Sequence, residues 1–187
     1  MRKLWIGLAV AAALVLILGV SCVGSYNRLV ASDEQVDTAW AQVENVLQRR
    51  ADLIPNLVNT VKGYAAHEKE IFTQVADARS RLLAARTPGE AAEANGALDT
   101  ALGRLLAIAE AYPQLRASEN FVRLQDELAG TENRIANERR HYNDTVRDFN
   151  TRVRRFPTRI LAGMFGFESR EYFEATPGAE TAPRVSF

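Results

Sequence analysis

The sequence predicts an all-α protein, in which an N-terminal transmembrane helix is followed by an antiparallel four-helix bundle of long helices. Three observations support this class. Residues 4–25 contain no charged side chain. After them, apolar residues recur every three or four positions, which places them on one face of a helix. No stretch shows the strict alternation of apolar and polar residues that is typical of a half-buried strand.

The apolar segment 4–25 is long enough to cross a membrane, because a helix needs about 20 apolar residues to do so. Charges interrupt every later window, so a single span is expected. Three interpretations of this segment remain open. It is an uncleaved anchor, a secretory signal cleaved after the small-x-small sequence Gly19–Ser21, or a lipoprotein signal in which Cys22 receives the lipid.

The positive charges of Arg2 and Lys3 precede the span, and positive flanks stay in the cytoplasm. We therefore expect a single-pass protein of the cell (inner) membrane, with residues 26–187 outside the cytoplasm.

Three stretches after the span have a helical pattern: 26–86, 90–111 and 119–156. Pro55 removes a backbone donor and disfavours helical geometry at the residue before it. The apolar stripe keeps its phase across Pro55, which favours a kinked helix. A helix over all of 26–86 would measure roughly 90 Å, which favours a break. We count four helices by placing the break between the first two at Pro55.

The stretch 119–156 carries a coiled-coil-like seam, in which large apolar residues recur every seven positions. Its members are Phe121, Leu128, Ile135, Tyr142, Phe149 and Phe156. Pro157 ends the helix, and 156–167 is apolar with two glycines. The domains predicted are thus an anchor or signal segment (1–25), a helical bundle (26–167) and a disordered tail (168–187), which is rich in turn residues and poor in apolar ones.

Composition argues against several classes of function. The 23 basic and 23 acidic residues cancel, whereas nucleic-acid-binding proteins usually carry a basic excess. One cysteine and two histidines leave little for a metal site, and His67–Glu68 lacks the second histidine that a metalloprotease helix needs at position 71. No phosphate-binding loop or nucleophile motif appears. We expect no cofactor, no metal, no small-molecule substrate and no nucleic-acid partner.

Two stretches carry a family resemblance. The sequences YNRLVASDEQVDTAWAQVENVLQRRADLIPNLVNTVKGYAAHE (26–68) and LQDELAGTENRIANERRHYNDTVRDFNTRVRRFP (124–157) resemble the LemA family. The resemblance implies a membrane-anchored antiparallel helical bundle without an established activity. It also implies envelope partners of the membrane-peptidase kind.

Polar residues at helical positions are candidates for contacts between helices. Arg50, near Pro55, and Glu132, in the polar middle of the long helix, are expected to pair and to set the register of two helices. The alternative is two solvated faces. Asn143 and Asn150 follow aromatic residues inside a helix, where asparagine is disfavoured, so we expect hydrogen bonds to another helix. Their alternative role is a binding groove.

A basic patch lies beside the apolar stretch 156–167. If the fourth helix returns to the membrane, this patch would meet anionic headgroups and the apolar stretch would enter the interface. The alternative is a solvated helix end with an apolar cap on the core. The patch comprises Arg147, Arg152, Arg154, Arg155 and Arg159.

Together these features predict a membrane-tethered, non-enzymatic interaction or scaffolding protein of the cell envelope, with an unidentified protein partner. The alternatives are an envelope enzyme of unrecognised type and a lipid-anchored form of the same bundle. An enzyme would show a pocket with converging ionisable groups of shifted pKa.

Overall fold

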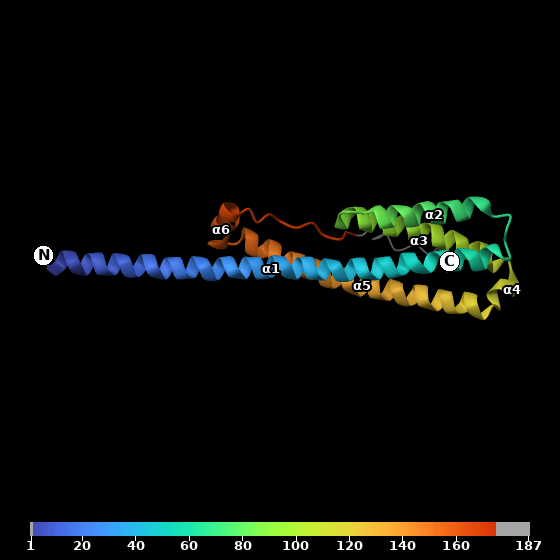
Figure 1. Ribbon diagram of the computed structural model, residues 1–187, viewed down its shortest axis with the longest axis horizontal. Helices are drawn as coiled ribbons and strands as arrows, with labels where there is room; N and C mark the ends of the chain where they lie inside the picture. Colours follow the sequence, from blue (N-terminus) through green and yellow to red (C-terminus); the bar gives the residue numbers. More distant parts are fainter. Residues whose placement is uncertain (1, 175–187) are drawn as a thin grey trace, which may run out of the picture. The chain divides into compact units, whose positions relative to one another are not determined.

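The computed structural model describes residues 2–174, and these residues form six helices and no strand, which confirms the all-α class (Figure 1). The chain divides into two compact units. Unit 1 comprises residues 1–38 and 144–170, and unit 2 comprises residues 39–143 and 171–187. The helices are α1 (Arg2–Lys62), α2 (Lys69–Ala84), α3 (Pro88–Glu110), α4 (Pro113–Arg116), α5 (Glu119–Arg154) and α6 (Thr158–Phe165).

Helix α1 begins with the predicted apolar segment. One 18-residue window of this helix has a mean hydropathy of 2.7, and none of the window is buried in the protein. Within residues 2–174, α1 is the one helix long and apolar enough to cross a membrane. The segment is part of the same helix that continues into unit 2, so the expected boundary at residue 25 is not a break in the backbone.

In unit 2, α2 and α3 and the adjoining parts of α1 and α5 run in alternating directions (Figure 1). Each fully buried Leu, Ile or Phe side chain stabilises such a core by about 1.5–3 kcal/mol. On α1 the apolar stripe passes through Leu57, which is fully buried, whereas the adjacent Val58 is partly exposed. The largest members of this core are Phe121, Ile54, Leu57, Leu98, Leu105, Leu115, Val43, Val61 and Val75.

The predicted helix break at Pro55 is wrong, because α1 continues through Pro55 to Lys62. A proline in a helix leaves the carbonyl four residues earlier without its amide donor. That carbonyl belongs to Ala51, which is fully buried. The Nε–H of Arg79, on α2, donates to the Ala51 oxygen at 2.7 Å. A side chain from the neighbouring helix thus supplies the donor that the proline removes, and the chain turns only after Lys62.

Helix α3 begins at Pro88, two residues before the predicted helical stretch 90–111. Thr87 is the N-cap: its side-chain oxygen accepts from the amide of Glu90 at 3.2 Å, and the Glu90 carboxylate accepts from the amide of Thr87 at 3.3 Å. This reciprocal capping box, with Pro88 in the first turn, satisfies amides that have no partner inside the helix.

The predicted seam of α5 is buried from Phe121 to Val153 and then ends. Phe156, the last predicted member of the seam, is 77% exposed, and Ile160 beyond it is 57% exposed. The cause is the end of α5 at Arg154, after which the chain turns and α6 starts a new direction. Helix α6 ends at Gly166, which adopts a left-handed conformation with a φ of 77° that favours glycine.

Residues 168–174 lie in the predicted disordered tail, and their contacts contradict that part of the prediction. Phe173 is only 2% exposed, and the backbone around it is hydrogen-bonded. The rest of the tail, 175–187, lies outside the described residues. We call residues 168–174 the C-terminal segment.

Candidate functional site

The predicted contact between Arg50 and Glu132 is present in unit 2. The Arg50 side chain on α1 is 6% exposed, and one of its terminal nitrogens lies 2.7 Å from the carboxylate of Glu132 on α5. Two residues of α3 complete the cluster. The same nitrogen donates to the Asn95 amide oxygen at 2.8 Å, and the other terminal nitrogen forms an ion pair with Asp99. One arginine therefore joins three helices.

We call Arg50, Asn95, Asp99 and Glu132 the arginine cluster. Its charged side chains differ in how far they are exposed. Glu132 and Asp99 keep 50% and 40% of their side chains exposed, whereas Arg50 is buried and its Nε–H has no acceptor among the described residues. Burial raises the pKa of the Asp99 carboxyl above its ordinary value of 3.8, the positive charge of Arg50 opposes this rise, and the negative charge of Glu132 adds to it. The arrangement suits a fixed contact between helices.

Asn95 and Asp99 were not predicted as members of this cluster. On α3 they are linked to each other, because the Asn95 amide donates to Asp99 at 3.1 Å. A signal was present in the sequence: Asn95 replaces an apolar residue in the stripe of Ala91, Leu98 and Leu102, so a polar group points into the core.

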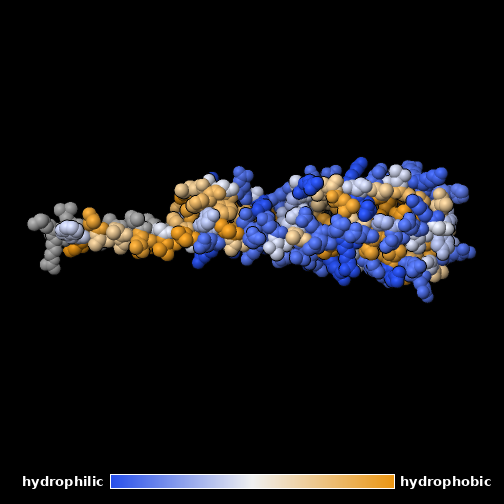
Figure 2. Space-filling view, in the orientation of Figure 1, coloured by the Kyte–Doolittle hydropathy of each residue, from blue (hydrophilic) through white to orange (hydrophobic). Residues whose placement is uncertain are grey.

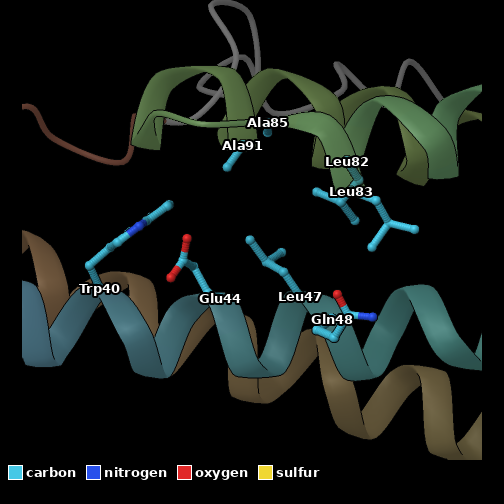
Figure 3. Close-up of a pocket in the computed structure, with 8 residues that line it drawn as sticks. All are labelled: Trp40, Glu44, Leu47, Gln48, Leu82, Leu83, Ala85 and Ala91. Carbon is cyan, nitrogen blue, oxygen red and sulfur yellow. The ribbon is translucent and has the colours of Figure 1, made fainter.

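An open groove of about 510 Å³ borders this cluster in unit 2. Asn95 and Asp99 contribute to its wall, together with Arg139 and Phe173. A second hollow, of about 100 Å³, lies between α1 and the α2–α3 connection, with Trp40, Glu44 and Leu47 facing Leu82 and Ala91 (Figure 3). Its volume is below the 300–1,000 Å³ of typical ligand pockets, and Glu44 is the one ionisable side chain that lines it.

Asn143 and Asn150 both bind backbone of the C-terminal segment, and within residues 2–174 neither binds the other helix that we expected. In unit 2, the Asn143 side chain donates to the carbonyl of Phe173 at 3.0 Å and accepts from its amide at 2.9 Å. In unit 1, Asn150 forms the same pair of bonds with Arg170, at 2.9 and 2.8 Å. A side-chain amide matches an extended backbone residue in this way, because it offers one donor and one acceptor side by side.

Neighbouring contacts strengthen both attachments of the C-terminal segment. In unit 2, the Tyr142 hydroxyl donates to the carbonyl of Glu171 at 2.8 Å, and Phe173 packs near Trp40 with ring centroids 6.2 Å apart. In unit 1, the Arg170 guanidinium lies 2.8 Å from Asp33 and 3.2 Å from Asp37. Tyr142, Asn143 and Asn150 therefore hold the C-terminal segment against α5. Helical periodicity in the sequence does not reveal the C-terminal segment as a partner of α5, because an extended segment has no helical periodicity.

The five arginines of the predicted basic patch are all exposed, but they are not equivalent. Arg147 lies 2.9 Å from Asp144 and 3.8 Å from Asp148. Among the described residues, Arg152, Arg154, Arg155 and Arg159 have no carboxylate within ion-pair distance. We call these four residues the arginine group.

Apolar side chains accompany the arginine group in unit 1. Met164 and Phe165 of α6 are 72% and 55% exposed. The Phe165 ring also lies 4.7 Å from that of Tyr26, the residue that follows the apolar segment. Cys22, the candidate lipid-attachment site, is an exposed free cysteine near this end of the segment.

Comparisons with known proteins find one family model and several relatives. The LemA family model matches residues 39–187. Magnetosome protein MamQ 2 of Paramagnetospirillum magneticum and magnetosome protein MamQ of Magnetospirillum gryphiswaldense are each 27% identical over 182 residues, which cover 83% of this chain and 67% of each relative. Protein LemA of Metamycoplasma hominis is 25% identical over 122 residues, which cover 65% of this chain and 56% of that protein. The family match spans most of the sequence, including the arginine cluster and the two asparagines that bind the C-terminal segment. This chain therefore belongs to the LemA family.

Proposed function

We propose that the chain is a membrane-tethered, non-enzymatic interaction protein of the cell envelope, which presents unit 2 to a protein partner outside the cytoplasm. The observation that carries this proposal is the change of environment along α1. Trp5 and Val20 are 73% and 66% exposed, whereas Val43 and Leu57 are fully buried in unit 2. Exposed apolar side chains over this length suit lipid, and the same helix then forms the core of the bundle without an intervening linker.

The polar groups inside unit 2 support a structural role for that unit. Arg50 holds residues of two other helices, and Asn143 holds the C-terminal segment. Groups engaged in this way stabilise one arrangement of the helices. A scaffold needs such a fixed surface, since rigidity limits the entropy lost when a partner binds.

The orientation is tested by labelling with a membrane-impermeant maleimide in intact cells. A Val122→Cys substitution places a thiol on an exposed position of unit 2, in a Cys22→Ser background that removes the native thiol. We expect labelling from outside without permeabilisation, because Arg2 and Lys3 keep the N-terminus in the cytoplasm. Labelling that requires permeabilisation would contradict the proposed orientation.

The interaction role is tested by crosslinking in native membranes followed by purification and mass spectrometry. We expect one discrete complex that contains this chain and a second membrane or envelope protein. As a control, the apolar segment is replaced by a leucine–alanine sequence of the same length. This variant should keep the complex, because the proposal assigns binding to unit 2. Recovery of the uncrosslinked chain alone would contradict the proposal.

A further inference from the structure

The apolar face of α6 is largely exposed in unit 1. Met164, Phe165 and Ile160 are 72%, 55% and 57% exposed, and Phe156, just before the helix, is 77% exposed. Ala162 on the same short helix is buried. A helix that buries one small residue and exposes several large apolar ones presents a surface for a partner or a membrane.

The position of α6 within unit 1 points to the membrane. Tyr26 directly follows the apolar segment, and its ring lies 4.7 Å from that of Phe165 and 6.0 Å from that of Phe167. The apolar side chains of α6 therefore lie where the apolar part of α1 ends, and Figure 2 shows the two apolar regions next to each other. Aromatic side chains are enriched at this level of membrane proteins, at the boundary between hydrocarbon and headgroups.

Charge specifies the kind of membrane surface. The sequence contains no Asp or Glu between Asp148 and Glu168, and the arginine group lies in this interval. Its four side chains are exposed and free of carboxylate partners among the described residues. Arginines next to exposed apolar side chains are the combination that binds anionic lipid headgroups.

The chain after α6 is held in place within unit 1. The amide of Phe167 donates to the carbonyl of Ala162 at 2.9 Å, and Gly166 reverses the chain in its left-handed conformation. Arg170 lies three residues after Phe167, and its backbone forms two hydrogen bonds with the side chain of Asn150. The segment that follows α6 is thus attached to α5.

We infer that α6 is an interfacial helix, which inserts Ile160, Met164 and Phe165 into the outer edge of the bilayer while the arginine group binds anionic headgroups. This inference rests on the proposed membrane tether. Helix α6 gives unit 1 a second attachment to the membrane, beside the span. Two attachments would hold unit 1 in one orientation on the lipid surface, where a span alone would leave it free to tilt.

The test uses the full-length chain reconstituted in vesicles of phosphatidylcholine with or without phosphatidylglycerol. An environment-sensitive fluorophore is attached through Met164→Cys, or through Val122→Cys as the control, each in the Cys22→Ser background. Quenching by aqueous iodide is compared with quenching by spin-labelled lipids. Burial of one large apolar side chain favours insertion by a factor of about 10 or more, so iodide should quench the M164C label at least about tenfold less than the V122C label. Spin-labelled lipids should quench the M164C label alone.

Charge variants separate the two parts of the inference. Replacing the arginine group by glutamine should weaken insertion of the M164C label in phosphatidylglycerol vesicles, by up to about fivefold for each arginine. Arg147→Gln is the matched control: Arg147 lies on the same exposed helix end but pairs with Asp144, so its loss should change nothing. An unchanged signal in the four-arginine variant would overturn the anionic-headgroup assignment.

Other outcomes identify what covers α6 instead. Equal iodide quenching of the M164C and V122C labels would overturn the inference. Protection from iodide without quenching by lipid labels would overturn it in favour of a protein surface, such as a second copy of this chain. Flotation of the protein with the vesicles reports on the span alone, so loss of flotation would count against the proposed tether, while the label reports on α6.

Discussion

Arg79 donates a hydrogen bond from its Nε–H to the carbonyl of Ala51, at a distance of 2.7 Å. Ala51 lies four residues before Pro55, so its carbonyl is the one that the proline leaves without a backbone donor. A contact between two helices therefore allows a proline inside the long helix that joins the membrane segment to unit 2.

The first prediction concerns this hydrogen bond. Arg79→Gln should lower the free energy of unfolding by about 1–2 kcal/mol, because a buried carbonyl loses its donor. In a Pro55→Ala background the same substitution should cost much less, since the amide at position 55 then serves Ala51. Thermal unfolding of the four proteins in detergent micelles, followed by circular dichroism, gives the interaction energy as a double-mutant cycle. Equal costs in both backgrounds would show that the hydrogen bond does not compensate the proline.

A second prediction concerns the arginine cluster. Arg50→Met should destabilise the protein by about 3 kcal/mol, because Asn95 and Asp99 lose their partner in a partly buried site. Glu132→Gln should cost at most about 1 kcal/mol, since that carboxylate is half exposed. Arg49→Met, at the exposed neighbouring position, is the matched control and should be close to neutral. The same unfolding measurement ranks the three, and a result in which R49M and R50M are equal would remove the cluster from the account.

The pH dependence of stability follows from Asp99. Its folded-state pKa is raised above 3.8, first by burial and then by Glu132, against the opposing charge of Arg50. The folded state then binds a proton more tightly than the unfolded state does. The contribution of Asp99 to stability is therefore fully present below pH 3.8 and is lost as the pH rises through the folded-state pKa. The difference in unfolding free energy between wild type and Asp99→Asn, measured across this range, should fall with rising pH. If the difference in unfolding free energy rose with pH, the folded-state pKa of Asp99 would be lowered rather than raised.

Attachment of the C-terminal segment gives a fourth prediction. Asn143→Leu removes both hydrogen bonds to Phe173 and should destabilise the protein by about 1–3 kcal/mol. The Phe173 amide should then exchange its hydrogen faster, as followed by mass spectrometry of the peptide that contains it. Asn133→Leu, at an exposed position of α5, should leave the exchange unchanged. Slow hydrogen exchange at the Phe173 amide in N143L would show that Asn143 does not hold the C-terminal segment.

The sequence predicted those features that follow from helical periodicity. The seam from Phe121 to Phe149 recurs every seven positions, and the apolar segment is a continuous run without charge. Arg50 and Glu132 are polar residues within helical stretches, and the structure brings them together. Features that depend on the tertiary partner were missed. Pro55 looked like a break because its donor comes from another helix. Phe173 looked like part of a disordered tail because the C-terminal segment is ordered by side chains on α5. The local sequence around Phe173 does not encode those contacts.

Alkaline carbonate extraction of membranes that contain the full-length chain tests the central claim most directly. The claim is that the apolar part of α1 is embedded in lipid and is continuous with the core of unit 2. The protein should stay in the membrane pellet, and its mass should include the N-terminal segment, 20.7 kDa for residues 1–187. Release of the chain into the supernatant, as for a peripheral or secreted protein, would contradict the account.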